Sequence, residues 1–476
     1  MNNAPQTSEN KTGTILYLVL LLALGANTLI VELTIPRMIA PIFGNTLFSW
    51  TAIIAVVLVA LTVGYRLGGI LATRLHVGRQ IVVFSAATAL WGFALSFAGD
   101  AIVKEMGWLN MMFGPLAAAA VLAFVPAFLD AAVVPMVIQA MPGEPGNVSG
   151  RCFAWSTVGS IIGVVATGYV LLPLLGVSGA LITGALLVSI TLVAITRKAL
   201  SLALVFVAVG AGYLAHDQSR DVVVDISNGY HRIRVTENNQ VRSLYLDNTL
   251  EGQVRLGDVK PVASYMVKVG ELIKTNLLDH GEELDSAFFL GGGSFSIPRY
   301  LKYLHPSMDV HVAEIDPEVI AIGKEFLELD DQVNVLVGDG RQTLKNSERK
   351  YDLIVNDAFQ GVRKIPFHLT TAEFNRIVQE RMSDNGIYMT NVRGHPANSY
   401  LASSFVKTLS QDFPYLYSER AAGHNYWVIA SKRPLNWARP IDKVGAMAQI
   451  LTDNHAPIEF LIVRDFVAER LGRSRS

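Results

Sequence analysis

The 476-residue sequence has little cysteine, no excess of either charge and no repetitive segment. Cys152 is its only cysteine, so the chain cannot form an internal disulfide, and a metal site built on paired thiolates is excluded. The 39 lysines and arginines nearly balance the 40 aspartates and glutamates, giving a net charge of -1. This balance, without a basic or low-complexity tract, does not indicate a nucleic-acid-binding surface. We therefore expect neither a metal nor a nucleic acid as a ligand.

Apolar residues, in contrast, are in excess. They make up 51% of the chain, more than a soluble protein of this length normally carries. Seven apolar runs are each near the length needed to cross a bilayer: 15–31, 51–64, 81–97, 115–128, 156–175, 179–195 and 202–215. An eighth span within 108–141 is left open. The sequence thus predicts an all-α transmembrane bundle of about seven spans over residues 1–216.

Ionisable residues interrupt these apolar runs. Glu32 lies at the end of the first run with Arg37 just beyond it, Arg66 lies in the glycine-rich stretch 64–69 that follows the second, and Asp130 lies near the fourth. Ionisable groups at such depth usually face a bundle interior or a cavity, although long side chains near the interface also extend to the membrane surface. Nearby glycines are expected to allow close helix packing: Gly64, Gly68, Gly69, Gly159 and Gly163.

Beyond residue 216 the sequence changes to short alternating segments. Apolar and polar residues alternate over 222–226, 232–237 and 241–246, and Asn238-Asn239 separates the second segment from the third. This pattern predicts a small antiparallel sheet with a hairpin. We assign residues 217–256 to this sheet and residues 257–476 to a separate α/β domain.

Four short apolar runs in the last domain each stop at glycine or a carboxylate. They end at Gly291-Gly292-Gly293-Ser294, at Glu314-Ile315, at Asp339-Gly340 and at Asp357. This is the spacing of successive parallel strands whose carboxyl ends line one crevice. The sequence therefore predicts a Rossmann-like domain that binds a nucleoside. The alternative is that the glycines form tight turns and the acids are solvated caps.

Each strand end suits one part of a nucleoside ligand. The glycines let the backbone turn sharply and approach the ligand closely. Glu314 lies about 20 residues further on, where a carboxylate accepts hydrogen bonds from ribose hydroxyls. Asp339 is placed to accept from an adenine amino group, and Asp357 to accept a proton from a reacting group. A strand-end cap without a catalytic role is the alternative for Asp357.

These motifs together resemble the polyamine aminopropyltransferases, the spermidine synthases, over roughly residues 222–432. The matching pieces are 227–235, 244–247, the glycine-rich loop, 314–319, 338–341 and 357–359. The first half is similar to the multi-span variety of this family, in which a transporter-like bundle is fused to a spermidine-synthase-like domain. The similarity there rests on 32–33, Arg37, 40–41, 43–44, Trp50 and 64–69.

The resemblance implies a retained nucleoside site and an altered amine site. The family's acid after the third glycine is Ser294 here, and Gln360 replaces the second aspartate of the fourth strand motif. The family's Tyr-His-Glu segment is missing, with residues 261–264 standing about there. The family's glutamine contact to the thioadenosine falls on Gln253, with Glu251 as the alternative register. Tyr245 and Tyr265 are expected at the mouth of the substrate site, together with Gln360.

The resemblance implies a membrane-bound transferase that uses S-adenosylmethionine or its decarboxylated form to alkylate an amine by aminopropyl-type transfer. Each lost carboxylate removes a charge-assisted hydrogen bond worth about 1.5 to 3 kcal/mol. The acceptor is therefore not expected to be putrescine, and a lipid or other amphiphile is a candidate. Two alternatives remain, a methyltransferase and a transporter or sensor with a regulatory adenosyl-binding domain, because fold alone does not set the reaction.

Expected partners are the lipid bilayer, a small amine or lipid acceptor and a second copy of the chain in a homodimer. The adenosyl donor places the C-terminal domain in the cytoplasm, at a bacterial-type inner (plasma) membrane. Positive charges in short loops favour the opposite orientation, namely Arg66, Arg74, Arg79, Arg197 and Lys198. Three histidines, His368, His395 and His424, show no ligand spacing and are expected to be ordinary loop residues.

Overall fold

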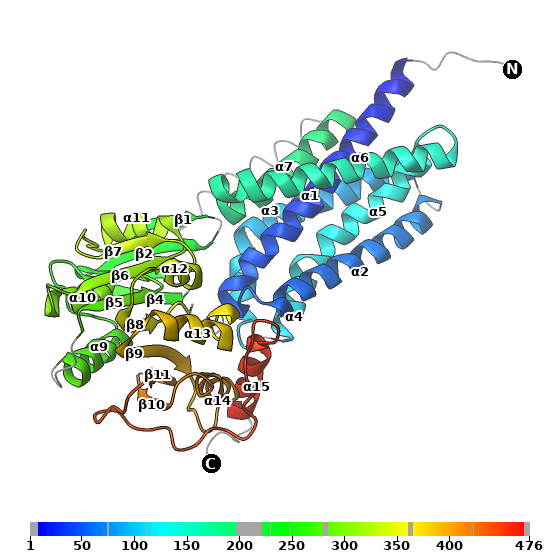
Figure 1. Ribbon diagram of the computed structural model, residues 1–476. Coiled ribbons are helices and arrows are strands. Elements are labelled where there is room, and N and C mark those ends of the chain that lie inside the picture. The colour runs from blue at the N-terminus through cyan, green and yellow to red at the C-terminus, as the bar shows by residue number, and fades with distance from the viewer. Residues whose placement is uncertain are drawn as a thin grey trace. The chain divides into compact units, whose positions relative to one another are not determined.

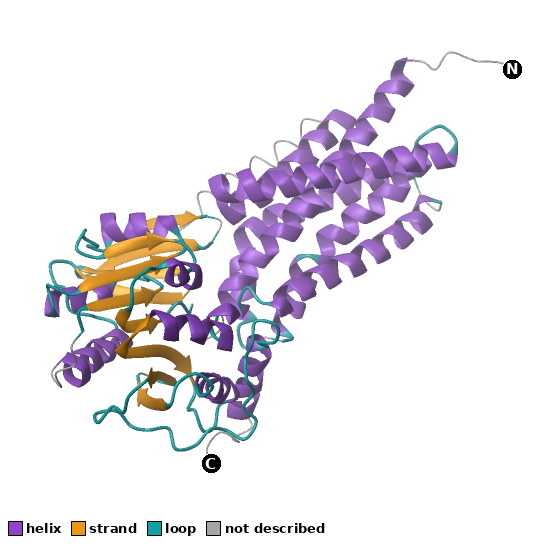
Figure 2. Cartoon of the chain, in the orientation of Figure 1, coloured by secondary structure: helices purple, strands orange, loops and turns teal. Residues whose placement is uncertain are grey.

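A computed structural model gives the fold of residues 8–73, 76–110, 112–196, 221–228, 230–247, 249–278, 284–359, 365–421 and 423–470. The chain divides into two compact units, residues 1–219 with 227–229, and residues 220–226 with 230–476. The first unit is helical, and the second holds the large sheet and its helices (Figure 2). The domain boundary expected at residue 256 falls inside the second unit and stays a prediction.

The first unit is built from long apolar helices (Figure 1). Their bounds are α1 Ser8–Phe43, α2 Leu47–Ala72, α3 Val77–Glu105, α4 Gly114–Leu122, α5 Phe124–Ala140, α6 Pro145–Ala166, the π-helical turn η1 Thr167–Leu171 and α7 Leu172–Thr196. Polar caps mark some of the ends. Thr46, for example, accepts a hydrogen bond from the Ser49 N–H at 3.2 Å and so begins α2.

Glycines set the close packing of these helices. Helix α1 packs against α6 and α7, α2 against α5, and α3 against α5 and α7. A Cβ atom at Gly159 would lie 2.0 Å from the Leu22 carbonyl oxygen, and one at Gly64 would lie 2.5 Å from that of Phe128. Gly68 and Gly163 are equally tight, as expected, whereas Gly69 has nothing within 4 Å of its Cβ position. The packing role predicted for Gly69 is therefore wrong.

Four helical segments are long and apolar enough to cross a membrane: Gly13–Phe43, Leu47–Ala72, Val77–Glu105 and Pro145–Thr196. Helices α4 and α5, bent by 45° at their junction, make a fifth if they count as one span. The expectation of about seven spans is not confirmed. The runs predicted at 156–175 and 179–195 lie in one 52-residue segment kinked at Gly176, and the run at 202–215 lies outside the described residues.

The small sheet has four strands in the order β1-β2-β3-β4. They are β1 Val222–Ser227, β2 Arg232–Asn238, β3 Val241–Leu246 and β4 Thr249–Arg255. Asn239 and Gln240 connect β2 to β3 with φ values of 49° and 61°, the left-handed backbone of a two-residue hairpin turn. The predicted hairpin is confirmed, and β4 is an additional strand that pairs antiparallel with β3.

The large sheet has seven strands in the order β10-β11-β9-β8-β5-β6-β7. They are β5 Ser286–Leu290, β6 Asp309–Glu314, β7 Asn334–Val337, β8 Tyr351–Asn356, β9 Met382–Arg393, β10 Tyr415–Arg420 and β11 Asn425–Ser431. Strands β5 to β9 are parallel, while β11 and β10 add an antiparallel edge. The chain runs outward from β5 to β7 and returns at β8, so the strand order reverses between β5 and β8, where ligands bind in such sheets.

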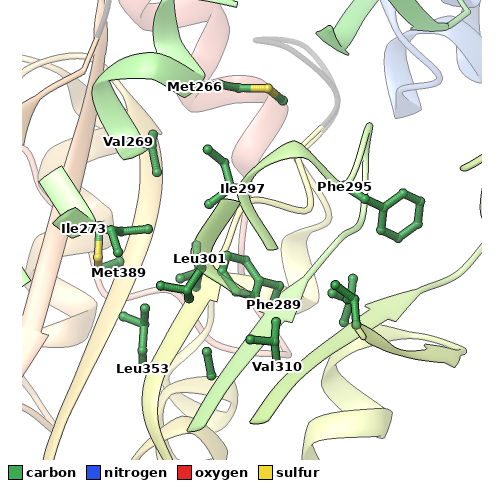
Figure 3. Close-up of a cluster of buried hydrophobic side chains, with 14 of the residues drawn as sticks. Met266, Val269, Ile273, Phe289, Phe295, Ile297, Leu301, Val310, Leu353 and Met389 are labelled. Carbon is green, nitrogen blue, oxygen red and sulfur yellow. The ribbon is translucent and has the colours of Figure 1, made fainter. Parts of the chain in front are cut away.

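Helices accompany the parallel strands. They are α9 Ser264–Glu271, continued by the π-helical η2 Leu272–Leu278, α10 Ser296–Leu304, α11 Pro317–Phe326, α12 Gly340–Asn346, α13 Ala372–Arg381, α14 Tyr400–Leu409 and α15 Ile458–Arg470. Alternate strand residues such as Phe289, Val310, Leu353 and Met389 pack with α9, α10 and α11 in one apolar core (Figure 3). This core holds the sheet rigid, so that its carboxyl ends can position polar side chains. The predicted α/β domain behind a small antiparallel sheet is confirmed.

Candidate active site

The glycine-rich turn after β5 has a backbone that only glycine fits. Gly291 has a φ of +91°, and a Cβ atom there would lie 2.9 Å from the Cα of Ala358. A Cβ at Gly292 would lie 2.3 Å from the ring of Phe295, which is fully buried beneath the turn. The Gly291 N–H donates to the Ala313 carbonyl oxygen at 2.9 Å. The turn is thus held tightly between the ends of β5, β6 and β8.

Glu314 at the end of β6 is bonded to this turn. Its Oε2 accepts from the Gly292 N–H at 2.8 Å, and its Oε1 accepts from the Asp316 N–H at 3.0 Å. The side chain is buried, and this burial raises the pKa of its carboxyl group, against the lowering effect of the two N–H donors. Each carboxylate oxygen keeps a second lone pair. Glu314 can therefore accept further hydrogen bonds from a diol such as ribose.

Asp339 follows β7 and has two structural partners. Its Oδ1 accepts from the Gln342 N–H at 3.0 Å and caps α12. Its Oδ2 lies 2.8 Å from Nε2 of His368, which belongs to the short helix η3 Phe367–Leu369. An open pocket borders both side chains, and Arg341, Phe367 and Asp453 also line it. His368, which we expected to be an ordinary surface or loop histidine, thus lies beside the Asp339 carboxylate at this pocket.

Asp357 directly follows β8, on the opposite side of β5 from Glu314. Its N–H donates to the Leu290 carbonyl oxygen at 3.2 Å, and its Oδ1 accepts from Asn391 Nδ2 at 2.9 Å. The surrounding protein excludes water from the carboxyl group and so raises its pKa to about 6, although the Asn391 hydrogen bond acts to lower it. A carboxylate with this pKa exists in both protonation states near neutral pH. Such a group is suited to accept a proton.

Tyr265 of α9 lies near two carboxylates. Its hydroxyl donates to the backbone carbonyl oxygen of Glu251 in β4 at 3.2 Å. Burial raises the pKa of the Tyr265 phenol well above 10, and the negative charges of Asp357 and Glu251 raise it further. The phenol therefore stays protonated. The structure brings Tyr265 close to Asp357, as expected of a residue that lines the substrate site.

Ser294 and Gln253 lie where β4 meets the glycine-rich turn. The Ser294 side chain is fully buried, with its Oγ 2.7 Å from Ser296 Oγ. A Cβ atom at Gly252 would lie 2.0 Å from that Oγ. Gln253 accepts from Ser296 Oγ through its backbone carbonyl, and its side chain donates to Ser243. The hydroxyl of Ser294 is bonded within the protein and is not presented to a ligand.

The other predicted site residues lie as follows. Gly293 continues the turn with a φ of +51°, and Gly340 begins α12 against the Leu290 side chain. The Ile315 side chain is exposed. Tyr245 lies in β3 with the Arg234 guanidinium 5.2 Å from its ring centre. Gln360 lies outside the described residues, so its place in the substrate site stays a prediction.

Asn391 is the site residue that the sequence analysis missed. It lies in β9, which pairs parallel to β8 with Asn356 opposite Thr390. This register carries Asn391 beside Asp357. The same strand-end rule that identifies Glu314 and Asp339 applies to this fifth parallel strand. The polar pair Thr390-Asn391 after an apolar run is the signal that could have identified it.

Known proteins resemble the second unit. Residues 269–429 match a family model described as the spermine/spermidine synthase domain. A probable polyamine aminopropyl transferase of Bifidobacterium longum is 32% identical over 111 residues, 23% of this chain and 25% of that protein. The polyamine aminopropyltransferase of Neisseria meningitidis is 29% identical over 171 residues, 34% of this chain and 62% of that protein. The chain thus spans less than two thirds of either relative.

A similar structure has also been solved. The crystal structure of a probable spermidine synthase from Corynebacterium glutamicum superposes with a TM-score of 0.40 at 18% sequence identity. The alignment covers 44% of this chain and 80% of that one.

Proposed function

We propose that this chain, whose residues 269–429 carry a spermine/spermidine synthase domain, transfers an aminopropyl-type group from an S-adenosyl sulfonium donor to an amine. The observation that carries the proposal is Asp357. It stands where the strand order reverses, hydrogen-bonded to Asn391 and close to Tyr265, with a pKa raised to about 6. A base is needed there if an amine is to lose a proton during transfer.

The nucleoside of the donor occupies the ends of β5, β6 and β7. The turn at 291–293 approaches the donor closely, Glu314 accepts from the ribose hydroxyls, and Asp339 accepts from the adenine amino group. His368 holds the Asp339 carboxylate from the other side at 2.8 Å. These roles follow from the acceptor atoms present at each strand end. They leave Asp357 free for the reacting end of the donor.

The transfer itself is a displacement at carbon. The amine nitrogen forms a bond to the carbon attached to the sulfonium, and the carbon–sulfur bond breaks with its electron pair moving to sulfur. Sulfur leaves as a neutral thioether, methylthioadenosine when the transferred group is aminopropyl. The proton lost from the amine passes to the Asp357 carboxylate. The protein chiefly has to hold the nucleophile about 3 to 3.5 Å from the carbon under attack.

The acceptor we propose is an amine other than putrescine, carried by a lipid or another amphiphile. The side chain at position 294 is a buried serine, so it supplies no carboxylate for an ammonium group. Large apolar side chains are exposed on several helices of the first unit, including Leu58, Leu90, Ile161 and Ile190. Such surfaces suit contact with lipid chains. A membrane-held enzyme, with its second unit in the cytoplasm, would meet a lipid acceptor directly.

Titration calorimetry on the detergent-solubilised full chain tests the donor. Decarboxylated S-adenosylmethionine, S-adenosylmethionine and methylthioadenosine would each be titrated. We expect saturable binding of decarboxylated S-adenosylmethionine and of methylthioadenosine, lost in Asp339→Ala. Absence of binding by all three ligands would refute the transferase proposal.

A methyltransferase is the second candidate, and Ser294 is the observation that favours it. Without an acid at this position, the carboxylate of intact S-adenosylmethionine meets less repulsion. The two activities give different products, because methyl transfer releases S-adenosylhomocysteine whereas aminopropyl transfer releases methylthioadenosine. Mass spectrometry of the nucleoside product formed with an amine acceptor would decide between them.

A further inference from the structure

The helical unit holds a buried carboxyl group that the transferase proposal does not use. Asp130 of α5 is 3% exposed. Its Oδ2 accepts from Asn27 Nδ2 at 3.0 Å and lies 2.9 Å from Thr28 Oγ1, both on α1. Asn27 and Thr28 are themselves buried. The carboxyl group thus joins two helices far apart in the sequence through polar contacts.

Other helices enclose this group without a counter-charge. Thr88 of α3 lies close to the Asp130 carboxyl, although its hydroxyl forms no hydrogen bond within the described residues. Gly184 of α7 leaves room for the Asn27 amide oxygen, 2.6 Å from its Cβ position. Tyr65 of α2 is a titratable neighbour on which the charge of Asp130 acts. Within the described part of the bundle, no lysine, arginine or histidine forms an ion pair with Asp130. An ionised carboxylate there would be buried without a compensating charge.

Two polar atoms at this group lack hydrogen-bond partners. They are Oδ1 of Asp130 and the hydroxyl of Thr88 on α3, both buried. Buried polar atoms in proteins are nearly always hydrogen-bonded, so each exception requires an explanation. An arrangement that leaves one carboxylate oxygen unbonded is poorly suited to an anion, because a carboxylate needs donors on both oxygens.

Counting hydrogens shows which protonation state fits the observed distances. Thr28 has one hydroxyl hydrogen but two acceptors, the Leu24 carbonyl oxygen at 3.0 Å and Asp130 Oδ2 at 2.9 Å. An ionised Asp130 would leave one of these two contacts without a hydrogen. A proton on Oδ2 resolves this conflict, because Oδ2 donates to Thr28, Thr28 donates to Leu24, and Asn27 donates to Oδ2. Every short contact then has one hydrogen.

We propose that Asp130 is a proton-binding site inside the helical unit, with Thr28 and Asn27 as its hydrogen-bonding partners. The proton comes from water and is bound on Oδ2, and its release returns it to water. When the proton is bound, it completes a chain of hydrogen bonds from Asp130 of α5 through Thr28 to the backbone of α1. Its loss breaks that chain and places an unpaired charge among α1, α3 and α5. Proton uptake would therefore tighten the contact between α1 and α5, as a proton-coupled transporter or sensor requires.

Infrared difference spectroscopy of the full chain in lipid vesicles tests this site. Spectra would be recorded from about pH 5 to about pH 9, the range in which shifted carboxyl groups titrate. We expect a carboxylic-acid C=O band that disappears as the pH rises and that is absent in Asp130→Asn. Thr28→Val keeps the side-chain shape without the hydroxyl and should shift the band, whereas Thr28→Ser should leave it in place.

The helix content of the detergent-solubilised variants, measured by far-ultraviolet circular dichroism, serves as the folding control, because the substitutions lie in the helical unit. Three outcomes would overturn the proposal. The Asp130 band could be absent at every pH, which would mean a permanently ionised carboxylate. It could persist unchanged at every pH, which would mean a fixed structural hydrogen bond. It could instead respond to Na⁺ at constant pH, which would identify a metal-cation site.

Discussion

Asp357 is the residue at which burial and chemistry are most closely linked. Its pKa of about 6 means that the group becomes a competent base only above that pH. We expect kcat/KM to rise through about pH 6, and Asp357→Asn to lower kcat by about 10² to 10⁴ and abolish this rise. Removing the Asn391 donor in Asn391→Leu should move the rise to higher pH. A pH–rate profile with a saturating donor checks both effects, and an unchanged profile in Asp357→Asn would assign the base to another group.

The Asp357 carboxyl group should also destabilise the folded state when it is ionised. Its pKa in the folded protein, about 6, lies above the unfolded value of about 3.9. The stabilising contribution is therefore complete below about pH 4 and lost as the pH rises through about 6. Asp357→Asn keeps the Asn391 hydrogen bond and should raise the free energy of unfolding of the second unit by up to about 3 kcal/mol at pH 8. Denaturant unfolding at pH 8 and at pH 4 should show this gain only at the higher pH.

Asp339 caps α12, and we propose that it also binds the adenine of the ligand. A pair of substitutions can separate these two roles. Serine caps helices about as well as aspartate, whereas alanine costs about 1 kcal/mol. Asp339→Ser and Asp339→Ala should both weaken methylthioadenosine binding by about tenfold or more. Only Asp339→Ala should also lower the melting temperature. Full affinity in Asp339→Ser would show that the carboxylate serves α12 rather than the ligand.

Single residues also show how far the sequence predicts the site. Glu314, Asp339 and Asp357 are recognisable because each follows an apolar run, and the structure places all three at strand ends. The partners of these acids are not recognisable in this way. His368 meets Asp339 across 29 residues of chain and Asn391 meets Asp357 across 34, and such pairs depend on strand register and loop path.

At the scale of elements, the turn between β5 and α10 is the most constrained segment of the site. Gly291→Ala would place a Cβ against Ala358 in addition to forcing a positive φ. Gly257 shares the positive φ of +77° but has nothing within 4 Å of its Cβ position, so Gly257→Ala is a matched control for the backbone strain alone. Strain of this kind costs about 1 to 3 kcal/mol. Thermal unfolding should show a clearly larger loss for Gly291→Ala, with adenosyl binding reduced in that variant alone.

Elements with regular patterning are predicted well, and those without it are not. Strands β2 and β3 alternate clearly, and their predicted bounds agree with the structure within one residue. Strand β4 is missed because one of its inward positions is Gly252, which carries no hydrophobic signal. The expected number of spans in the first unit is not confirmed for a related reason. No charged residue stands between Arg151 and Arg197, so composition does not mark where one span ends and the next begins.

At the scale of the whole molecule, two compact units imply two unfolding steps. The proposed adenosyl site belongs to the second unit, so a ligand bound there would stabilise that unit by about 2.7 kcal/mol at 100 times its dissociation constant. We expect calorimetry of the full chain to show two transitions, of which methylthioadenosine raises only one. Asp339→Ala should reduce this shift while the other transition stays in place. A single transition that moves as a whole would show that the units unfold cooperatively.

The strand order of the large sheet has a consequence for the nascent chain. Of this sheet, the ribosome makes β5 first, the middle one of the five parallel strands, and then β6 and β7, which extend the sheet in one direction only. These three strands carry Gly291, Glu314 and Asp339, whereas Asp357 comes with β8 on the other flank. Because domains form as units while synthesis proceeds, a half-made sheet already contains every group assigned to the nucleoside. During biosynthesis, the strand ends proposed to hold the donor are thus made before the strand end proposed to supply the base.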